Sequence, residues 1–222
     1  MAEYLNKYDT TAQYTAESND RAALGETVSL VTLDGKVYYD RSTVKIGDKV
    51  YNVVKMPDGK RWLAQNLDWV PNGVTLIRSA AEFVTDAPAC SYYNYTNNGR
   101  GLSYNAQALN VISQSLPEGW RVASPDDWNT LMTAIGGNTV ANLRKIRSTE
   151  HWPTSQGTDE LGLNIEPNGD SRWDLPDSAY FLGGVAYIRT TGGKRARLSD
   201  NEILGIGTTN TTSVIPIRLV KG

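Results

Sequence analysis

The chain has 222 residues, of which 40% are hydrophobic and 21% are charged, with a formal net charge of −2. These values are typical of one sizeable globular domain, with room for a small appendage, and they exclude general disorder. The charge balance offers no basic surplus for nucleic acid, and no apolar run reaches the roughly 18 residues of a membrane-spanning helix. We therefore predict neither nucleic-acid binding nor membrane insertion.

Cysteine and histidine are too scarce for most catalytic and metal centres. Cys90 is the only cysteine, which excludes an internal disulfide and a cysteine-rich zinc site, and His151 is the only histidine. The sequence has no G-x-S-x-G nucleophile elbow, no P-loop and no G-x-G-x-x-G turn opening a helix. We expect Cys90 to be an inert thiol, and we predict no catalytic residues, no metal ligands and no cofactor.

Residues 1–44 differ from the rest of the chain. Their first part is polar without a clear apolar stripe, and residues 27–40 predict a hairpin that turns at Asp34-Gly35. Because an isolated hairpin is marginal in water, we expect this one to pack on the main domain or on another copy of itself. We predict that residues 1–44 form an attachment or oligomerisation segment and that residues 45–222 form the ligand-binding domain.

A second hairpin opens the main domain. Residues 50–54 and 61–67 predict its strands, and Asp58-Gly59 predicts the turn between them. The helix that follows is predicted to have Ser103 as its N-cap and to end at Leu116-Pro117.

The next helix has the clearest local signals. Ser124 is predicted as its N-cap and Pro125 as its first residue, and the acidic pair 126–127 lies at the positive end of the helix dipole. Its buried stripe is predicted to contain Trp128, Leu131, Met132 and Ile135. Gly136-Gly137 predicts its end, and a short helical turn is expected over residues 140–146.

The last third of the chain predicts strands joined by long loops. From about residue 155 it is rich in Gly, Asn, Thr and Asp, and residues 161–165, 179–184, 185–189 and 213–220 form apolar runs. Pro216 in the last run indicates a sheet edge or a bulge. Strands, then two helices, then strands favour an α+β fold with an antiparallel sheet over a doubly wound parallel sheet.

Several landmarks occur in a characteristic order between Lys45 and Lys221. They are Gly59–Leu67 (G-x-x-W-x-x-x-N-L), Asn97–Leu102 followed by Tyr104-Asn105, Leu116–Val122 (L-P-E-G-W-R-V), Asp126–Trp128, Asp159–Leu163, Ser213-Val214 and Arg218–Lys221. Together they resemble the Fibrobacter succinogenes major paralogous domain family, and the G-W-R plus D-x-W element is the most specific part. The chain departs from the family at Leu116, where a Cys is usual, and at Phe181–Gly184, where W-S-S is usual.

The resemblance implies a C-type-lectin-like fold: a mostly antiparallel sheet whose first and last strands pair, two flanking helices and long C-terminal loops that present a ligand surface. It also implies kinship with the variable proteins of diversity-generating retroelements, in which adenine positions of the C-terminal codons are rewritten. Some of these proteins are phage tropism determinants, which bind a host-surface receptor as trimers. A homotrimer is therefore a further expectation.

The composition of residues 178–212 agrees with a binding surface, because Tyr and Arg anchor ligands while Thr and Asn adapt to them. The predicted contacts are Tyr180, Phe181, Tyr187, Arg189, Lys194, Arg195, Arg197, Asn201, Thr208, Thr209, Asn210, Thr211 and Thr212. For each residue alone, a place in a solvated loop is an equally good interpretation. The excess of 12 Tyr over 2 Phe also suits a half-wet binding surface, although Tyr replacing Phe in strands is the alternative.

These observations predict a non-enzymatic, retroelement-diversified receptor-binding protein that recognises a bacterial surface protein or glycan. The first residues lack the basic-then-apolar layout of a signal peptide, which favours a place in the virion, as part of a phage tail. A non-diversified adhesin or lectin-like domain of the bacterial envelope or cell surface is the alternative. A glycan-active enzyme is the third hypothesis.

Three short motifs also suggest sugar chemistry. Glu166-Pro167-Asn168 spells the E-P-N of sugar-binding C-type lectins, but Ca²⁺ needs six to eight oxygen ligands, so we interpret it as a turn. His151-Trp152 could stack on a sugar, with a half-buried structural pair as the preferred alternative. Asp159-Glu160 is expected to face solvent or cap a turn rather than serve as paired catalytic carboxylates.

Overall fold

The structure is a computed structural model that describes part of the chain. The described residues are 6–7, 26–33, 36–79, 82, 86–92, 99–154, 156–172, 179–180, 184–199, 204–210 and 213–222. For residues 6–7, 26–33, 36–41, 170–172 and 179–180 it describes the backbone alone.

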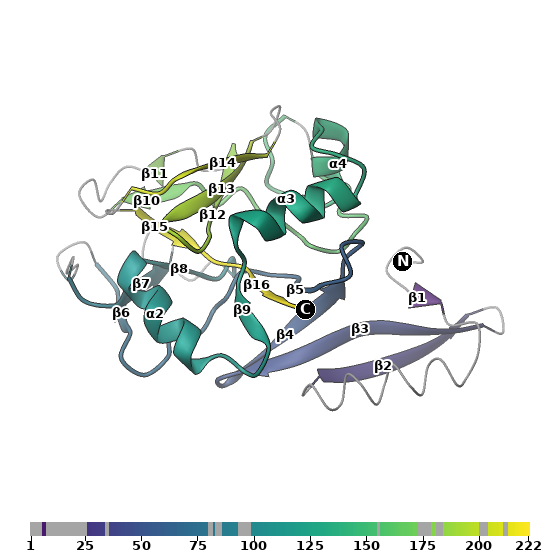
Figure 1. Cartoon of the computed structure of the whole chain (residues 1–222), viewed down its shortest axis with the longest axis horizontal. Helices are drawn as coiled ribbons and strands as arrows, with labels where there is room; N and C mark the ends of the chain where they lie inside the picture. Colours follow the sequence, from purple (N-terminus) through teal and green to yellow (C-terminus); the bar gives the residue numbers. More distant parts are fainter. Residues whose placement is uncertain are drawn as a thin grey trace.

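The largest sheet joins the two ends of the described chain (Figure 1). Its strand order is β1-β3-β4-β5-β16-β9, with β2 also paired to β3, and all its pairs are antiparallel. The strands are β1 (Asn6–Lys7), β2 (Glu26–Leu33), β3 (Lys36–Ile46), β4 (Lys49–Lys55), β5 (Arg61–Leu63), β9 (Trp120–Val122) and β16 (Leu219–Lys221). The C-terminal strand β16 therefore lies between β5 and β9, inside the sheet.

Two smaller sheets contain the other strands. The six-stranded sheet has the order β11-β10-β15-β8-β7-β6, and the three-stranded sheet has the order β12-β13-β14. The strands are β6 (Thr75–Ile77), β7 (Ala89–Tyr92), β8 (Leu102–Tyr104), β10 (Asp170–Arg172), β11 (Ala179–Tyr180), β12 (Val185–Arg189), β13 (Lys194–Ser199), β14 (Gly205–Thr208) and β15 (Ser213–Pro216). Among the pairs of described strands only β6–β7 is parallel, which confirms the predicted α+β class with mostly antiparallel sheets.

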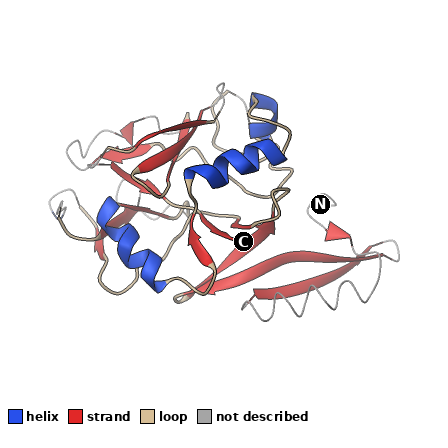
Figure 2. Cartoon of the chain, viewed as in Figure 1, coloured by secondary structure: helices blue, strands red, loops and turns tan. Residues whose placement is uncertain are grey.

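The helices of the described residues are α2 (Ala106–Ser115), α3 (Pro125–Ala134) and α4 (Val140–Arg144). In Figure 2 the two longer helices, in blue, flank the red strands. The capping of α3 is as predicted: the Ser124 side chain accepts from the Asp127 amide, and the Asp127 side chain accepts from the Ser124 amide. The end of α3 before Gly136-Gly137 and the short helix α4 are also confirmed.

The predicted start of α2 is wrong. Its N-cap is Asn105, whose side chain accepts from the amide of Ala108, whereas Ser103 belongs to strand β8. Asn105 also ties the helix to strand β7, because its Oδ1 accepts from the Ala89 amide at 3.0 Å and its Nδ2 donates to the Ala87 carbonyl at 2.8 Å. The pairing of β8 with β7 and β15 thus extends the strand past the residue that the local pattern selects as the cap.

We expect Asn105→Ala to lower the free energy of unfolding by about 1–3 kcal/mol, because it removes a helix cap and leaves a buried amide unpaired. Urea unfolding followed by circular dichroism measures this loss. Ser103→Ala is the matched control and is expected to cost less than about 1 kcal/mol. A larger loss for Ser103→Ala than for Asn105→Ala would contradict the observed cap.

The N-terminal hairpin is confirmed in its strands. β2 and β3 pair with Leu33 opposite Lys36, and the turn at Asp34-Gly35 lies outside the described residues. β3 runs on to Ile46 and pairs with β4, so the predicted boundary between residues 44 and 45 falls within this strand. In Figure 1 β1, β2 and the adjoining part of β3 extend away from the other strands and helices. The attachment or oligomerisation role of residues 1–44 stays a prediction.

Three predicted strands differ from the structure. Residues 213–220 form two strands in different sheets, β15 and β16, and the break follows Pro216, which has no amide hydrogen to continue the ladder. Residues 161–165 form no regular strand, and Ile165 makes only an isolated bridge to Arg147. The predicted strand over 61–67 is limited to β5.

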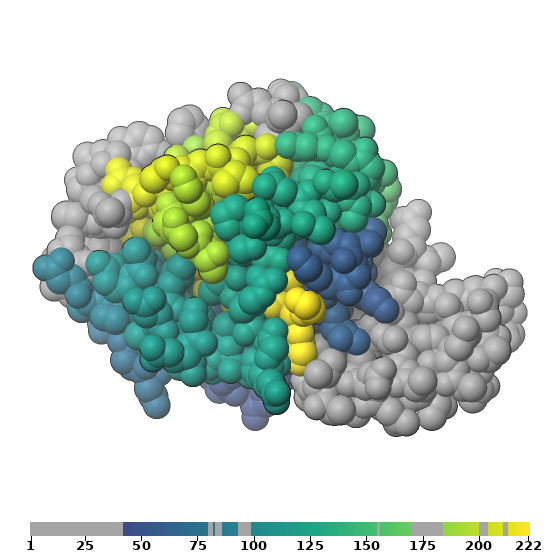
Figure 3. Space-filling view, in the orientation of Figure 1, coloured from purple at the N-terminus to yellow at the C-terminus, as the bar shows by residue number. Residues whose placement is uncertain are grey.

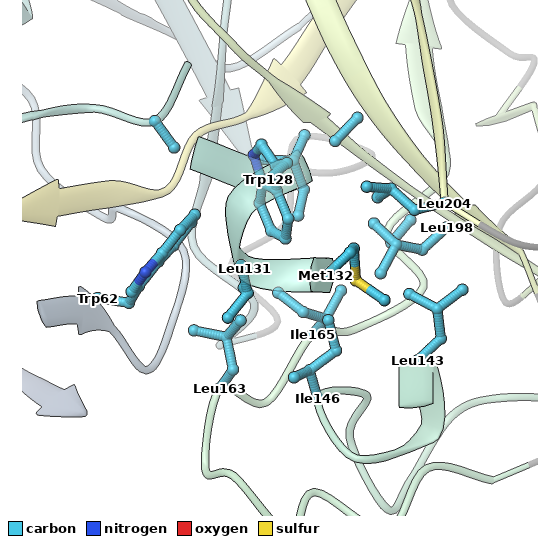
Figure 4. Packing of buried hydrophobic residues seen from close by; sticks show 14 of the residues in the cluster. Trp62, Trp128, Leu131, Met132, Leu143, Ile146, Leu163, Ile165, Leu198 and Leu204 are labelled. Carbon is cyan, nitrogen blue, oxygen red and sulfur yellow. The ribbon is translucent and has the colours of Figure 1, made fainter. Parts of the chain in front are cut away.

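The main core lies between α3, α4 and the three-stranded sheet. Figure 4 shows side chains of this cluster converging from both sides, among them Trp128 and Met132 of α3 and Leu198 of β13. Trp62 of β5 meets Trp128 edge-on, with ring centroids 5.0 Å apart. The predicted buried stripe of α3 is confirmed, since Trp128, Leu131, Met132 and Ile135 are all buried.

Candidate functional site

Most of the sequence landmarks form the frame of the domain. Arg218 is buried, and its Nε donates to Asn66 Oδ1 at 2.8 Å. Its Nη1 donates to the carbonyls of Leu63 and Leu163 at 2.8 and 2.7 Å, and its Nη2 donates to the Asn164 carbonyl at 2.9 Å. One side chain thus joins β5, the N-L segment, the turn near residue 163 and the C-terminal segment.

Asp127 is a second junction of the frame. Its carboxylate is 2% exposed and accepts from Lys60 Nζ at 2.6 Å, from both terminal nitrogens of Arg121, and from the amide and hydroxyl of Ser124 at 2.7 and 2.8 Å. Burial alone would raise the pKa of Asp127, but these charged and polar donors outweigh it and hold the pKa well below its usual range. The D-x-W element therefore anchors α3 to the turn before β5 and to β9.

The Asp159 side chain caps a turn, as expected. Its Oδ1 accepts from the Asn164 amide at 2.7 Å, and its own carbonyl accepts from the Gly162 amide at 2.9 Å. It also acts on Arg218: burial lowers the pKa of Arg218 to about 9, and the negative charges of Glu166 and Asp159 partly oppose that shift. The D-x-x-G-L landmark is thus structural.

The two sugar-like motifs are also structural. Trp152 is 1% exposed, and its Nε1 lies within hydrogen-bond distance of Ser148 Oγ at 3.1 Å and the Ile165 carbonyl at 3.2 Å, so it cannot stack on a sugar. His151 is exposed, which corrects the predicted half-buried pair. In the E-P-N segment Asn168 is buried, and Glu166 Oε2 lies 3.1 Å from Arg100 Nε.

Metal and thiol chemistry have little support in the described ranges. Within them, no group of three or more His, Cys, Asp or Glu side chains is placed to hold a metal ion. Burial raises the pKa of Cys90 to about 12, with a smaller contribution from the charge of Asp68, so the thiol is an inert core side chain as predicted. No helix in the described part of the chain is long and apolar enough to cross a membrane.

Six of the predicted contact residues lie on the three-stranded sheet, namely Tyr187, Arg189, Lys194, Arg195, Arg197 and Thr208. Because side chains alternate along a strand, each strand presents one set to α3 and the other to the opposite face. The set facing α3 belongs to the main core and comprises Ala186, Ile188, Ala196, Leu198 and Ile206. The opposite set, which we call the outer face, comprises Tyr187, Arg189, Arg195, Arg197, Gly205 and Gly207.

The cross-strand register sets the geometry of the outer face. Arg195 lies opposite Arg189 on one side and Gly207 on the other, and Arg197 lies opposite Tyr187 and Gly205. Arg195 and Arg197 are partly exposed. The Arg195 guanidinium carbon lies 4.2 Å from the centroid of the Tyr187 ring, close enough for a cation–π contact. On the outer face, the two arginines therefore lie beside the glycines of β14, which have no side chains.

Three predicted contacts are buried. Tyr187 is 5% exposed and lies in a small cluster with Val185 and Ile215, and Arg189 is 2% exposed and donates from Nη2 to the Ser213 carbonyl of β15. Thr209 is 7% exposed. The contacts of β12 with β15 explain the first two, because β15 covers the part of the outer face that β12 contributes. These three side chains lie beneath the surface and are not available for contact with a ligand.

The remaining predicted contacts divide into exposed and undescribed residues. Lys194, Thr208 and Asn210 are exposed, and Lys194 lies opposite Thr208 at the end of the sheet. Phe181, Asn201, Thr211 and Thr212 lie outside the described residues, as does the side chain of Tyr180. Figure 3 shows lime and yellow atoms, the colours of this part of the chain, at the molecular surface.

Sequence reasoning missed Gly205 and Gly207. A Cβ built on either glycine meets no atom of the described residues within 4 Å, so the described part of the structure leaves the space above this backbone open. Their alternation with Ile206, which packs against the main core, is the signal that marks one open and one buried face of β14.

Comparison with known proteins agrees with the landmarks. A family model described as the Fibrobacter succinogenes major domain matches residues 57–221, from the turn before β5 to the end of β16. No curated protein and no solved structure matches the chain. Since the family model covers well over half of the sequence, the chain belongs to the Fibrobacter succinogenes major domain family.

Proposed function

We propose that this protein is a non-enzymatic, retroelement-diversified ligand-binding protein of a phage tail, which recognises a bacterial surface protein or glycan. The observation that carries the proposal is the separation of frame and surface in the C-terminal third. Arg218 and Asp127 hold the frame through buried contacts, and none of the described residues that hydrogen-bond to these two side chains lies on β13 or β14. The outer face can therefore change while the frame is conserved in position.

A C-type-lectin-like fold is part of the proposal. Three features support it: the last strand, β16, pairs with β5 near the start of the family domain, two helices flank the strands, and the chain between α4 and β16 carries the short strands and loops of the surface. Assembly as a homotrimer belongs to the same proposal and is testable by light scattering of the purified chain.

The alternating burial of side chains along β13 predicts which codons vary if the protein is diversified. Sequencing the gene and its flanks from a mixed natural population is expected to reveal a reverse transcriptase gene and a near-copy of the codons for residues 178–218. Substitutions are expected only at adenines, at codons such as those for Lys194 and Arg197, while the codons for Ala196 and Leu198, whose side chains are fully buried, stay fixed.

An invariant segment without a nearby template copy would remove the retroelement part of the proposal. It would leave a non-diversified adhesin of the bacterial surface as the alternative. Binding of the purified chain to a panel of bacterial cells tests the shared core of both functions, because each requires a surface ligand. Absence of binding to every strain in a broad panel would contradict both.

A further inference from the structure

The three-stranded sheet has a charge of one sign. The charged residues of β12, β13 and β14 are Arg189, Lys194, Arg195 and Arg197, all cationic, in a chain whose formal net charge is −2. Three of them, Arg189, Arg195 and Arg197, share the outer face, and Arg189 lies directly opposite Arg195. Arg189 is buried and donates to the Ser213 carbonyl, so the cations of this face that solvent reaches are Arg195 and Arg197.

The side chains are suited to anions of a defined shape. A guanidinium group is planar and presents its donors as a fork that matches a carboxylate, phosphate or sulfate group. The cation–π contact with Tyr187 restrains Arg195, so less conformational entropy is lost when it binds.

The neighbouring strand leaves room for the ligand. At Gly205 and Gly207 no atom that the structure describes lies within 4 Å of an added Cβ, so a bulky group can approach the β14 backbone beside Arg197 and Arg195.

The polarity of the surface favours a glycan over a protein partner. The core of a protein–protein interface is apolar or aromatic. Among the described residues the exposed large hydrophobic side chains are Val50 and Val70, and neither belongs to the three-stranded sheet. We infer that the outer face binds an acidic polysaccharide, whose anionic groups lie against Arg195 and Arg197 and whose sugar rings lie over Gly205 and Gly207. This inference rests on the proposed function, since it names the class of surface ligand.

The test measures binding of the full chain to dextran sulfate and to polygalacturonate at physiological ionic strength, with uncharged dextran and poly-glutamate as comparisons. Both acidic polysaccharides are expected to bind, uncharged dextran is not, and poly-glutamate is expected to bind at least about tenfold more weakly. Arg197→Gln is expected to weaken binding about tenfold, whereas Lys45→Gln, which removes an exposed positive charge from β3, leaves it unchanged.

A second pair of variants tests the open glycine surface. Gly207→Glu places a carboxylate beside Arg195 and is expected to abolish binding, while Val50→Glu adds the same charge at a position that is 61% exposed and has no effect. Thermal unfolding of each variant shows that the fold is retained. Equal binding of poly-glutamate, equal losses for Arg197→Gln and Lys45→Gln, or no binding of either acidic polysaccharide would overturn the inference.

Failure of this inference can be distinguished from failure of the proposed function. If the chain binds bacterial cells, and neither Arg197→Gln nor added polygalacturonate reduces that binding, the protein recognises a surface ligand of another class. If the chain binds no cell in the panel, the proposed function itself fails.

Discussion

Replacing Arg218 with methionine is expected to lower the free energy of unfolding by at least about 3 kcal/mol. Methionine keeps much of the side-chain volume but leaves Asn66 Oδ1 and the carbonyls of Leu63, Leu163 and Asn164 without their donor. Each buried acceptor that loses its partner costs about 1–3 kcal/mol, because no water replaces the guanidinium. Urea unfolding at neutral pH measures the loss.

Arg197→Met is the matched control, because it makes the same change at a partly exposed arginine of β13. We expect it to change stability by no more than about 1 kcal/mol. If Arg218→Met does not fold, Arg218→Lys is the variant to measure. Lysine keeps the charge but cannot reach all four acceptors, so the free energy of unfolding is expected to fall by a smaller amount. Similar losses at positions 197 and 218 would contradict the frame role of Arg218.

Replacing Asp127 with asparagine is expected to lower the free energy of unfolding at neutral pH by about 2 kcal/mol or more. The change removes the charge that binds Lys60 and Arg121 while keeping the size of the side chain. Arg121 is 44% exposed, so solvent screens part of its attraction and the loss is smaller than for a fully buried ion pair.

The pH dependence of this loss follows from the lowered pKa of Asp127. A carboxylate whose pKa is lower in the folded state stabilises the protein above its unfolded pKa, near 4, and loses that effect as the pH falls toward the folded pKa. The difference in the free energy of unfolding between the native chain and Asp127→Asn is therefore expected to stay constant from neutral pH down to about 5. Below pH 4 this difference is expected to decrease by about 1.4 kcal/mol per pH unit.

Asp126→Asn is the control for this series. Asp126 is exposed in the same first turn of α3, so its loss removes only the interaction with the helix dipole, which is less than about 1 kcal/mol. Urea unfolding between neutral pH and pH 3 compares the three proteins. A gap for Asp127→Asn that does not narrow under acid conditions would show that its charge is not what stabilises the frame.

Elements whose signals are local were predictable from the sequence. Helix α3 has its N-cap, first proline, acidic first turn and terminal glycines within residues 124–137, so no distant contact was needed to place it. The start of α2 depends instead on strand pairing, which carries Ser103 into β8 and moves the cap to Asn105. The division of residues 213–220 between two sheets is likewise a tertiary effect.

The candidate surface was predictable in composition but not in geometry. The sequence indicated that Arg195 and Arg197 belong to a binding segment, yet β13 was missed because its basic residues hide the alternation of Ala196 and Leu198. The burial of Arg189 could not be foreseen, since β15, far along the chain, covers it. The open space over Gly207 likewise becomes visible only when the register of β13 and β14 is known.

The pairing of β5 with β16 closes the domain on itself, with Trp62 opposite Val220. The residues between these two strands therefore form one long segment whose ends are paired. Because β5 and β16 are far apart in sequence, the free energy of their pairing is gained late in folding. Once the ends are joined, lengthening a surface loop costs little, about 0.6 kcal/mol for each doubling of its length. Loops of the three-stranded sheet can therefore differ in length as well as in side chains while β5 and β16 stay paired.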